Sequence, residues 1–295
     1  SRLEYRLAYK LGSVMRPRRS VLYMPAANTR AMDKARDLPC DGIIFDLEDA
    51  VAVASKEQAR GNVVAQISAG GYGRRELIVR VNGLDTPWGR DDLRACAQLP
   101  IDALLFPKVS SRQYVEEIDE LLRQYNPDMP IWIMIETPTA LIDMEQFAGH
   151  PRVQVLVMGT SDLVQELRAT HTTERHNLGY ALQRSVAVAR HFGKEILDGV
   201  HLDFRNTDSL LAVCEHGKAL GFDGKTLIHP DQIGTANSVF GYSSSEEDHA
   251  RAVIAAWQQA EAQGRGVAEL DGQLIENLHV AAAERVIAYA EAQRD

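Results

Sequence analysis

The sequence predicts an α/β protein, a (β/α)8 barrel followed by a C-terminal helical extension. Eight short strand-like runs alternate with helical patterns before residue 240 of the 295. Nearly all of these runs are continuously apolar, as strands covered on both faces of a parallel sheet require. Charged residues close several runs, and the carboxyl ends of barrel strands meet at one mouth. The main rival, a doubly wound open sheet, lacks its signal because no GxGxxG follows the first strand.

The expected strands and helices follow one another in a regular order. Strands are expected at the runs RSVLYMP, GIIFDLE, ELIVRVN, DALLFPK, PIWIMIE, VQVLVMG, ILDGVHL and DGKTLIH. Helices are expected at residues 28–38, 55–68, 110–124, 174–192 and 207–220, several of them opened by Ser, Thr or Asn caps. The regular alternation favours one barrel over two unrelated domains.

The chain is expected to have three parts. Residues 1–14 are interpreted as a leader, either native or added, and residues 15–240 as the barrel. Residues 241–295 are surplus to a closed barrel and contain two expected helices, one from Ser244 to about residue 263 and one ending near Ala292. Glycines at 264, 266 and 272 interrupt them. This tail could cover a barrel mouth, including that of a neighbouring subunit, or pack on the barrel exterior.

The composition of the chain argues against several classes of protein. The formal net charge of -9 and the absence of a Lys/Arg stripe argue against a nucleic-acid partner. No apolar run approaches the roughly 20 residues that span a bilayer, so a cytoplasmic protein without membrane segments is expected. Cys40, Cys96 and Cys214 are widely spaced and odd in number, which favours buried free thiols over a disulfide framework or a zinc site.

Two carboxylates are the candidate metal ligands. Glu136 ends the fifth expected strand, and Asp162 follows the sixth at an expected helix start, in MGTSDL. Both should face the mouth, where two carboxylates together with substrate oxygens and water suit octahedral Mg²⁺. Mn²⁺ is a candidate substitute for Mg²⁺ at such oxygen ligands.

Arg80 ends the third expected strand. Burying its positive charge there would cost free energy unless an anion neutralised it. Its planar fork fits a substrate carboxylate, and a structural ion pair with Asp46 or Glu48 is the alternative. Asp46 and Glu48 are expected to support the site without binding the metal directly, either by orienting metal-bound water or through an ion pair with Lys108 of FPK.

A local basic cluster precedes the first strand. Arg16, Arg18 and Arg19 could meet a phosphate-bearing ligand although the whole chain is acidic, and a solvated cluster is the alternative.

The order of several motifs resembles the citrate lyase beta-subunit family of acyl-CoA lyases. The resemblance runs from about Arg18 to the final helix through RRSVLYMPAAN, DGIIFDLEDAV, VRVNGLDTPWG, LLFPKV, IETPTAL, MGTSDL, DGVHLDFRN and GFDGKTLIHPDQI. It implies a TIM barrel that cleaves a 3-hydroxy-acyl thioester between the hydroxyl-bearing and alpha carbons. It also implies Mg²⁺ and a homotrimer or a larger homo-oligomer such as a hexamer.

Carried over by motif, Glu136 and Asp162 resemble the metal ligands, and Arg80 resembles the arginine that grips the keto acid. The backbone around Gly159 and Thr160 would lie against the same acid, and the basic cluster would meet CoA.

Two positions depart from the family pattern. Family members tend to have a Glu-Asp pair where this chain has Ser161 followed by Asp162, so the aspartate ligand is retained. A C-terminal DGxMID segment, whose last Asp enters an adjacent subunit's site, reads DGQLIE here. Glu276 keeps the acid, with one more methylene, and is the expected proton-transfer group.

The expected substrate is citramalyl-CoA, cleaved to acetyl-CoA and pyruvate. Malyl-CoA and citryl thioesters, on CoA or on an acyl carrier protein, are the alternatives, because one methyl group typically gives only about 10- to 200-fold discrimination. A thioester hydrolase with the same metal and acids is the alternative from another reaction class.

Overall fold

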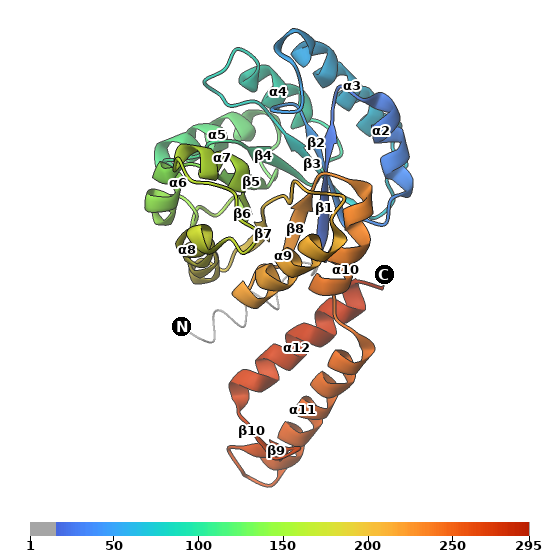
Figure 1. Cartoon of the computed structure of the whole chain (residues 1–295), viewed down its shortest axis with the longest axis vertical. Coiled ribbons are helices and arrows are strands. Elements are labelled where there is room, and N and C mark those ends of the chain that lie inside the picture. The colour runs from blue at the N-terminus through green and yellow to red at the C-terminus, as the bar shows by residue number, and fades with distance from the viewer. Residues whose placement is uncertain (1–15, 295) are drawn as a thin grey trace. The chain divides into compact units, whose positions relative to one another are not determined.

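The computed structural model describes residues 16–294. Residues 18–240 contain a closed barrel of eight parallel strands (Figure 1). Each strand pairs in parallel with the next, and β8 closes the barrel against β1, so the predicted fold class is confirmed. The strands are β1 (Ser20–Pro25), β2 (Gly42–Asp46), β3 (Glu76–Arg80), β4 (Ala103–Phe106), β5 (Ile131–Ile135), β6 (Val153–Met158), β7 (Glu195–Asp198) and β8 (Gly224–Leu227).

Helices surround the barrel on its outside (Figure 1). They are α2 (Thr29–Lys34), α3 (Lys56–Ala69), α4 (Gly89–Cys96), α5 (Arg112–Tyr125), α6 (Pro138–Asp143), α7 (Thr160–Glu166), α8 (Gly179–His191), α9 (Thr207–Leu220) and α10 (Ile233–Phe240). The expected helix at 207–220 has the observed bounds, whereas the one expected at 174–192 begins only at Gly179. The helix start expected at Asp162 is confirmed by α7, whose first turn contains this residue. Helices α4 and α6 were not predicted, because six to eight residues give too short a stretch for a helical period to be recognised.

The apolar runs are explained by two separate cores. In β5, Trp132 and Met134 pack in the barrel interior, while Ile131, Ile133 and Ile135 pack against the helix layer. All five side chains are at most 3% exposed. Since successive strand residues point to opposite faces, a strand buried on both faces loses the polar alternation of a half-exposed sheet.

A charged cluster closes the N-terminal end of the barrel. The buried Arg18 guanidinium donates to both carboxylate oxygens of Glu76 at 2.7 Å and to Glu195 at 2.5 Å. It also lies 5.3 Å from the ring centroid of Trp132. Glu76 and Glu195 are the first residues of β3 and β7, so this cluster lies at the end opposite the mouth.

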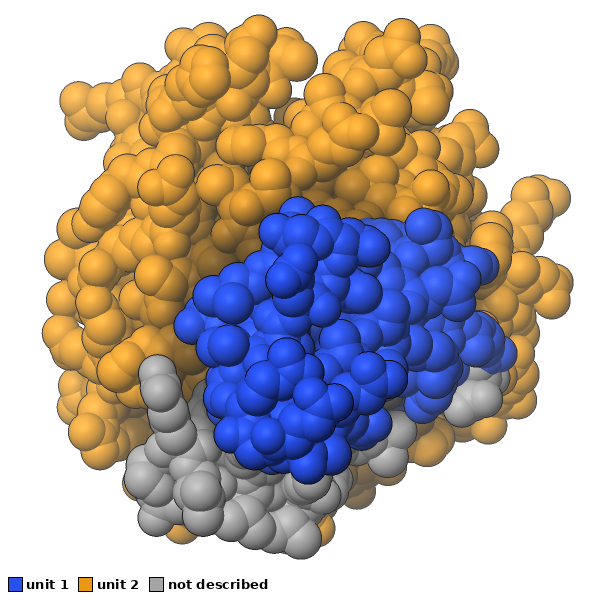
Figure 2. Space-filling view, turned by 90° about the horizontal axis from the view of Figure 1, so that it is seen from below, with its two compact units in different colours: residues 1–17, 241–295 blue, residues 18–240 orange. Residues whose placement is uncertain are grey.

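The chain divides into two compact units, which Figure 2 colours separately. Residues 18–240 form the barrel, and the other unit includes residues 16–17 and 241–294. In that unit α11 (Ser244–Ala262) and α12 (Asn277–Ala292) pack with the antiparallel pair β9 (Ala268–Leu270) and β10 (Gln273–Ile275). The proposed leader at residues 1–14 lies outside the described residues.

The β9–β10 hairpin was not expected from the sequence. Its two-residue turn consists of Asp271 with φ 52° and Gly272 with φ 77°. Asp-Gly is the pair that hairpin turns with two positive φ angles prefer, so this signal was present in the sequence. None of the described helices is both long and apolar enough to span a membrane.

Candidate active site

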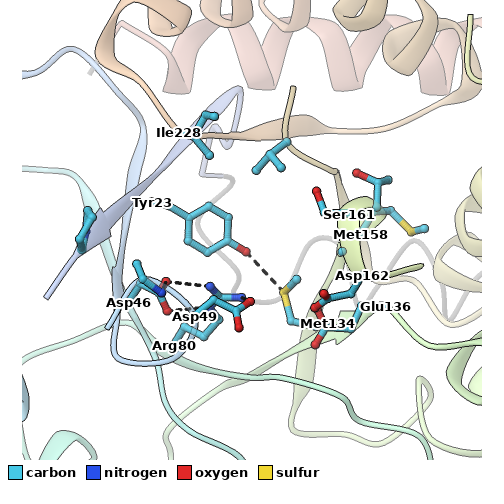
Figure 3. A pocket seen from close by; sticks show the side chains of 15 residues that line it. Tyr23, Asp46, Asp49, Arg80, Met134, Glu136, Met158, Ser161, Asp162 and Ile228 are labelled. Carbon is cyan, nitrogen blue, oxygen red and sulfur yellow. Dashed lines mark hydrogen bonds and ion pairs between the residues drawn. The ribbon is translucent and has the colours of Figure 1, made fainter. Parts of the chain in front are cut away.

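A cavity of about 330 Å³ lies at the carboxyl ends of the strands (Figure 3). It contains six of the predicted site residues: Asp46, Arg80, Glu136, Gly159, Thr160 and Asp162. The remaining lining is Tyr23, Pro25, Asp49, Ala50, Met134, Met158, Ser161, Val200 and Ile228. The mouth expected from the ends of the strands therefore exists, and apolar side chains such as Met134, Met158 and Ile228 line it together with the charged ones.

Glu136 follows β5 directly and is 1% exposed. Its Oε1 accepts a hydrogen bond of 2.7 Å from the backbone N–H of Lys108. Lys108 has a φ of 52°, a left-handed conformation that is uncommon for a residue with a side chain. The turn after β4 therefore fixes Glu136 through the main chain, and the ion pair expected between Lys108 and Asp46 or Glu48 does not form among the described residues.

Burial raises the pKa of Glu136 to about 8, and the nearby charges of Asp162 and Glu48 add to the shift. The Lys108 amide and Arg80 oppose it. Asp162 lies in the first turn of α7 beside Glu136, and its carboxylate makes no hydrogen bond or ion pair within the described part of the chain. Two acidic groups that destabilise each other in one cavity favour a bound cation.

The donor set fits magnesium. Glu136 and Asp162 supply hard carboxylate oxygens, and Mg²⁺ is often bound by only one or two protein carboxylates, with water and substrate completing the shell. Within residues 16–294 no group of three or more His, Cys, Asp or Glu side chains is arranged to hold a metal. A site of two carboxylates would therefore leave several positions for substrate oxygens.

Gly159 makes the approach of Glu136 to α7 sterically feasible. A Cβ at Gly159 would lie 2.4 Å from Glu136 Cβ and 2.5 Å from its Oε2, closer than van der Waals contact allows. The neighbouring Gly199 has the same role for Thr160, whose Oγ1 would lie 2.3 Å from an added Cβ. Gly159 and Thr160 were expected at the site, and close packing explains how they fit there.

Gly159→Ala should displace the Glu136 carboxylate and weaken Mg²⁺ binding while the barrel stays folded. A misplacement of about 1 Å at a reacting group can cost roughly 100-fold in rate, and a comparable loss of Mg²⁺ affinity is expected by calorimetry. Gly61→Ala in α3 is the matched control, because an added Cβ there meets nothing within 4 Å. Equal Mg²⁺ affinity in both variants would show that Glu136 does not hold the metal.

Arg80 is paired with three carboxylates, those of Asp46, Glu48 and, at 3.5 Å from its Nη1, Asp49. Its Nε and Nη2 donate to Asp46 Oδ1 and Oδ2, each at 2.7 Å, and its Nη1 lies 3.1 Å from Glu48 Oε2. Asp46 and Arg80 are paired residues on the adjacent strands β2 and β3. The structural ion pair considered as the alternative for Arg80 is therefore present. Arg80 also lines the cavity, so its position is compatible with a ligand contact as well.

Glu48 lies beside this pair and is not part of the cavity lining. Burial raises its pKa to about 7, and Asp49 and Asp46 raise it further, whereas Arg80 lowers it. A carboxyl group with a pKa near neutrality can exchange a proton with water under ordinary conditions. This property suits the supporting role that was expected for Glu48.

Tyr23 and Met134 also line the cavity and were not predicted from the sequence. Tyr23 is the fourth residue of β1, and its hydroxyl points towards the Met134 sulfur near the middle of the cavity (Figure 3). A polar aromatic residue near the carboxyl end of an apolar strand was the available signal. Ser161, which departs from the family pattern, also lines this cavity, and among residues 16–294 its buried Oγ has no hydrogen-bond partner.

The basic cluster does not lie at the mouth. Arg18 is paired at the N-terminal end of the barrel, and Arg19 donates from Nε and Nη2 to Asp41 at 2.8 and 2.7 Å. Both guanidinium groups are thus occupied by carboxylates at the end opposite the cavity. Arg16 belongs to the other compact unit. The expected contact of Arg18 and Arg19 with CoA is corrected on this ground.

Glu276 is exposed and occupies the N-cap position of α12. Its backbone N–H donates to His279 Nδ1 at 2.9 Å. Glu276 therefore starts a helix, which is the simpler explanation for an acid at this position. Its action in the site of a neighbouring subunit stays a prediction.

Comparisons with known proteins identify the family. The model of the HpcH/HpaI aldolase/citrate lyase family matches residues 19–230. A (3S)-malyl-CoA thioesterase of Cereibacter sphaeroides is 47% identical over 276 residues, which cover 94% of this chain and 95% of the relative. The citrate lyase subunit beta of Escherichia coli is 34% identical, with 94% of each chain covered.

A solved structure agrees with these relatives. The protein CitE of Mycobacterium tuberculosis, in complex with magnesium, acetoacetate and coenzyme A, is 25% identical, with a TM-score of 0.75 and coverage of 92% of this chain and 97% of that one. With a family model that spans most of the chain and relatives that match over nearly their whole length, this protein belongs to the HpcH/HpaI aldolase/citrate lyase family.

Proposed function

We propose that this protein is a Mg²⁺-dependent enzyme that hydrolyses the thioester of (3S)-malyl-CoA. The observation that carries the proposal is the cavity in which Glu136 and Asp162 face the fixed guanidinium of Arg80. This arrangement can receive a small hydroxy acid joined to a thioester. The similarity to a malyl-CoA thioesterase supports the choice of reaction over the citramalyl-CoA cleavage expected from the sequence.

Each residue of the cavity has a distinct task in this proposal. Glu136 and Asp162 would hold Mg²⁺, which acts as a Lewis acid towards the substrate oxygens that it contacts. Arg80 would orient the substrate carboxylate, and Asp46 keeps the guanidinium in place by its bidentate ion pair. Glu48, which lies outside the cavity lining, would support the Arg80 guanidinium through their ion pair.

Cleavage of citramalyl-CoA to acetyl-CoA and pyruvate is the second candidate. It is supported by the acid retained at Glu276 and by the similarity to citrate lyase beta subunits. In this reaction the hydroxyl proton leaves, the carbon-carbon bond breaks, and the resulting acetyl thioester enolate takes up a proton. Glu276 of a neighbouring subunit would supply that proton.

A panel of thioesters tests both candidates. Purified protein with Mg²⁺ is given (3S)-malyl-, citramalyl- and citryl-CoA, and the products are separated by chromatography. Free CoA with intact malate supports hydrolysis, whereas acetyl-CoA with glyoxylate, pyruvate or oxaloacetate shows cleavage and identifies the acyl group. Turnover of only the corresponding acyl carrier protein thioesters would instead assign the chain to a carrier-dependent complex.

Glu276 is proposed to act in the site of a neighbouring subunit of a homo-oligomer. Leu274 and Leu278, which flank it on the hairpin and on α12, are 59% and 64% exposed. Apolar side chains around an exposed acid suit a surface that is covered by another protein chain.

Mixing two inactive variants tests this assignment. Glu276→Gln and Glu136→Gln proteins should each lose activity, and their mixture should recover part of it, since some mixed sites receive both intact acids. Glu269→Gln on the same hairpin is the matched control and should keep full activity. Full activity of Glu276→Gln alone, or no recovery despite demonstrated subunit exchange, would contradict the role in trans.

A further inference from the structure

Tyr23 occupies a distinctive position in the cavity. Its ring lies beneath the guanidinium of Arg80, whose Cζ is 4.9 Å from the ring centroid. Its hydroxyl donates to Met134 Sδ at 3.4 Å, from β1 on one side of the cavity towards β5 on the other (Figure 3). The ion pair of Arg80 with Asp46 holds the guanidinium over the ring, and the ring packs against the apolar cluster of the barrel interior.

The resting partner of this hydroxyl is a poor one. A thioether sulfur is a weak acceptor, and the described residues offer the Tyr23 hydroxyl no other hydrogen bond. Burial raises the pKa of Tyr23 far above its ordinary value, and the carboxylates of Asp46, Glu136 and Glu48 act in the same direction against the opposing effect of Arg80. The phenol therefore keeps its proton and is available as a neutral donor.

The other neutral donors of the cavity are less well placed. Ser161 Oγ is inaccessible to solvent, and Thr160 packs its side chain against Gly199. The charged groups, Glu136, Asp162 and Arg80, suit the metal and the permanent charge of a substrate carboxylate. A neutral donor suits an oxygen that is uncharged in the substrate and gains charge only as the reaction proceeds.

We propose that Tyr23 is a catalytic residue whose hydroxyl leaves Met134 and donates to the thioester carbonyl oxygen of the substrate. The proposal rests on the proposed function, which supplies the acyl-CoA thioester, and adds the group that stabilises its oxyanion. It applies to either candidate reaction because both place negative charge on the same oxygen.

The electron flow is the same at this atom in both reactions. In hydrolysis a water oxygen bonds to the carbonyl carbon, and the carbonyl π pair moves to the carbonyl oxygen. When this electron pair re-forms the carbonyl, the carbon-sulfur bond breaks, and CoA leaves as a thiolate that takes up a proton. In cleavage the pair of the breaking carbon-carbon bond forms the enolate double bond and the carbonyl π pair moves to the oxygen. Tyr23 retains its proton throughout.

Tyr23→Phe tests the proposal by deleting only the hydroxyl. With the thioester that the wild type turns over, kcat should fall by about 100-fold, as on removal of one oxyanion donor, while KM changes little. Tyr72→Phe is the matched control, because the Tyr72 hydroxyl donates to Met32 O at 3.2 Å in the helix layer. That variant should keep the wild-type kcat.

A substrate analogue identifies the oxygen concerned. A thioether of CoA in which a methylene replaces the carbonyl should bind equally well to the wild type and to Tyr23→Phe, which also shows that the variant is folded. A wild-type kcat in Tyr23→Phe overturns the proposal, as does weaker binding of the carbonyl-free analogue. An inert wild type on every thioester of the panel would instead overturn the proposed function, and the assignment of Tyr23 with it.

Discussion

Asp162→Asn should abolish turnover and lower Mg²⁺ affinity by at least about 100-fold, because even residues that only support metal ligands are worth 10- to 100-fold. The exchange removes one of the two carboxylate charges that face each other in the cavity while keeping the size of the side chain. The barrel should remain folded, since Asp162 makes no hydrogen bond or ion pair with the described residues. Asp128→Asn is the control, because Asp128 is an exposed acid that precedes β5, at the end of the strand opposite Glu136, and does not line the cavity.

Mg²⁺ binding should also depend on pH. The pKa of Glu136 is raised to about 8, so below that pH the carboxyl group is largely protonated and metal binding must displace the proton. Apparent affinity should therefore rise as the pH increases from 6.5 to 8.5, as measured by calorimetry in buffers of different ionisation enthalpy. Full turnover in EDTA, or an affinity that does not change with pH, would contradict a metal held by Glu136.

Arg80→Lys should lower kcat/KM by about 100-fold or more, because lysine keeps the charge but not the planar fork. The substitution also breaks the bidentate contact with Asp46, which is 2% exposed. Breaking a buried ion pair typically costs about 3–5 kcal/mol, so the free energy of unfolding should fall by up to that amount. Denaturant unfolding and steady-state kinetics measure the two effects separately.

A second ion pair, between the half-buried Arg60 and a buried aspartate, separates the structural effect from the functional one. Arg60 Nη1 lies 3.0 Å from Asp92 Oδ1, and Asp92 is 1% exposed and lines no part of the cavity. Arg60→Lys should lower stability without lowering kcat/KM. If Arg80→Lys binds malate, the acid product of the proposed hydrolysis, as well as the wild type does, Arg80 has only the structural role that its ion pair already shows.

Short-range patterns were sufficient to predict much of the barrel. The continuously apolar run of β5 identified a strand covered on both sides, and the charged residues after it marked the mouth. Glu136 and Asp162 could be predicted as neighbours because parallel strands bring their carboxyl ends together whatever the details of packing. The short helices α4 and α6 and the β9–β10 hairpin gave weaker periodic signals, and these elements were missed.

The sequence by itself determined the fold class, the family and the set of charged residues at the carboxyl ends of the strands. Only the tertiary structure decided which of these groups meet. Arg80 pairs with Asp46 because β2 and β3 are in register, Lys108 contributes an amide because its backbone turns left-handed, and Arg18 closes the opposite end of the barrel. The physical reason is that strand periodicity sets the face of a side chain, whereas its partner depends on register, backbone dihedrals and close packing between segments far apart in the chain.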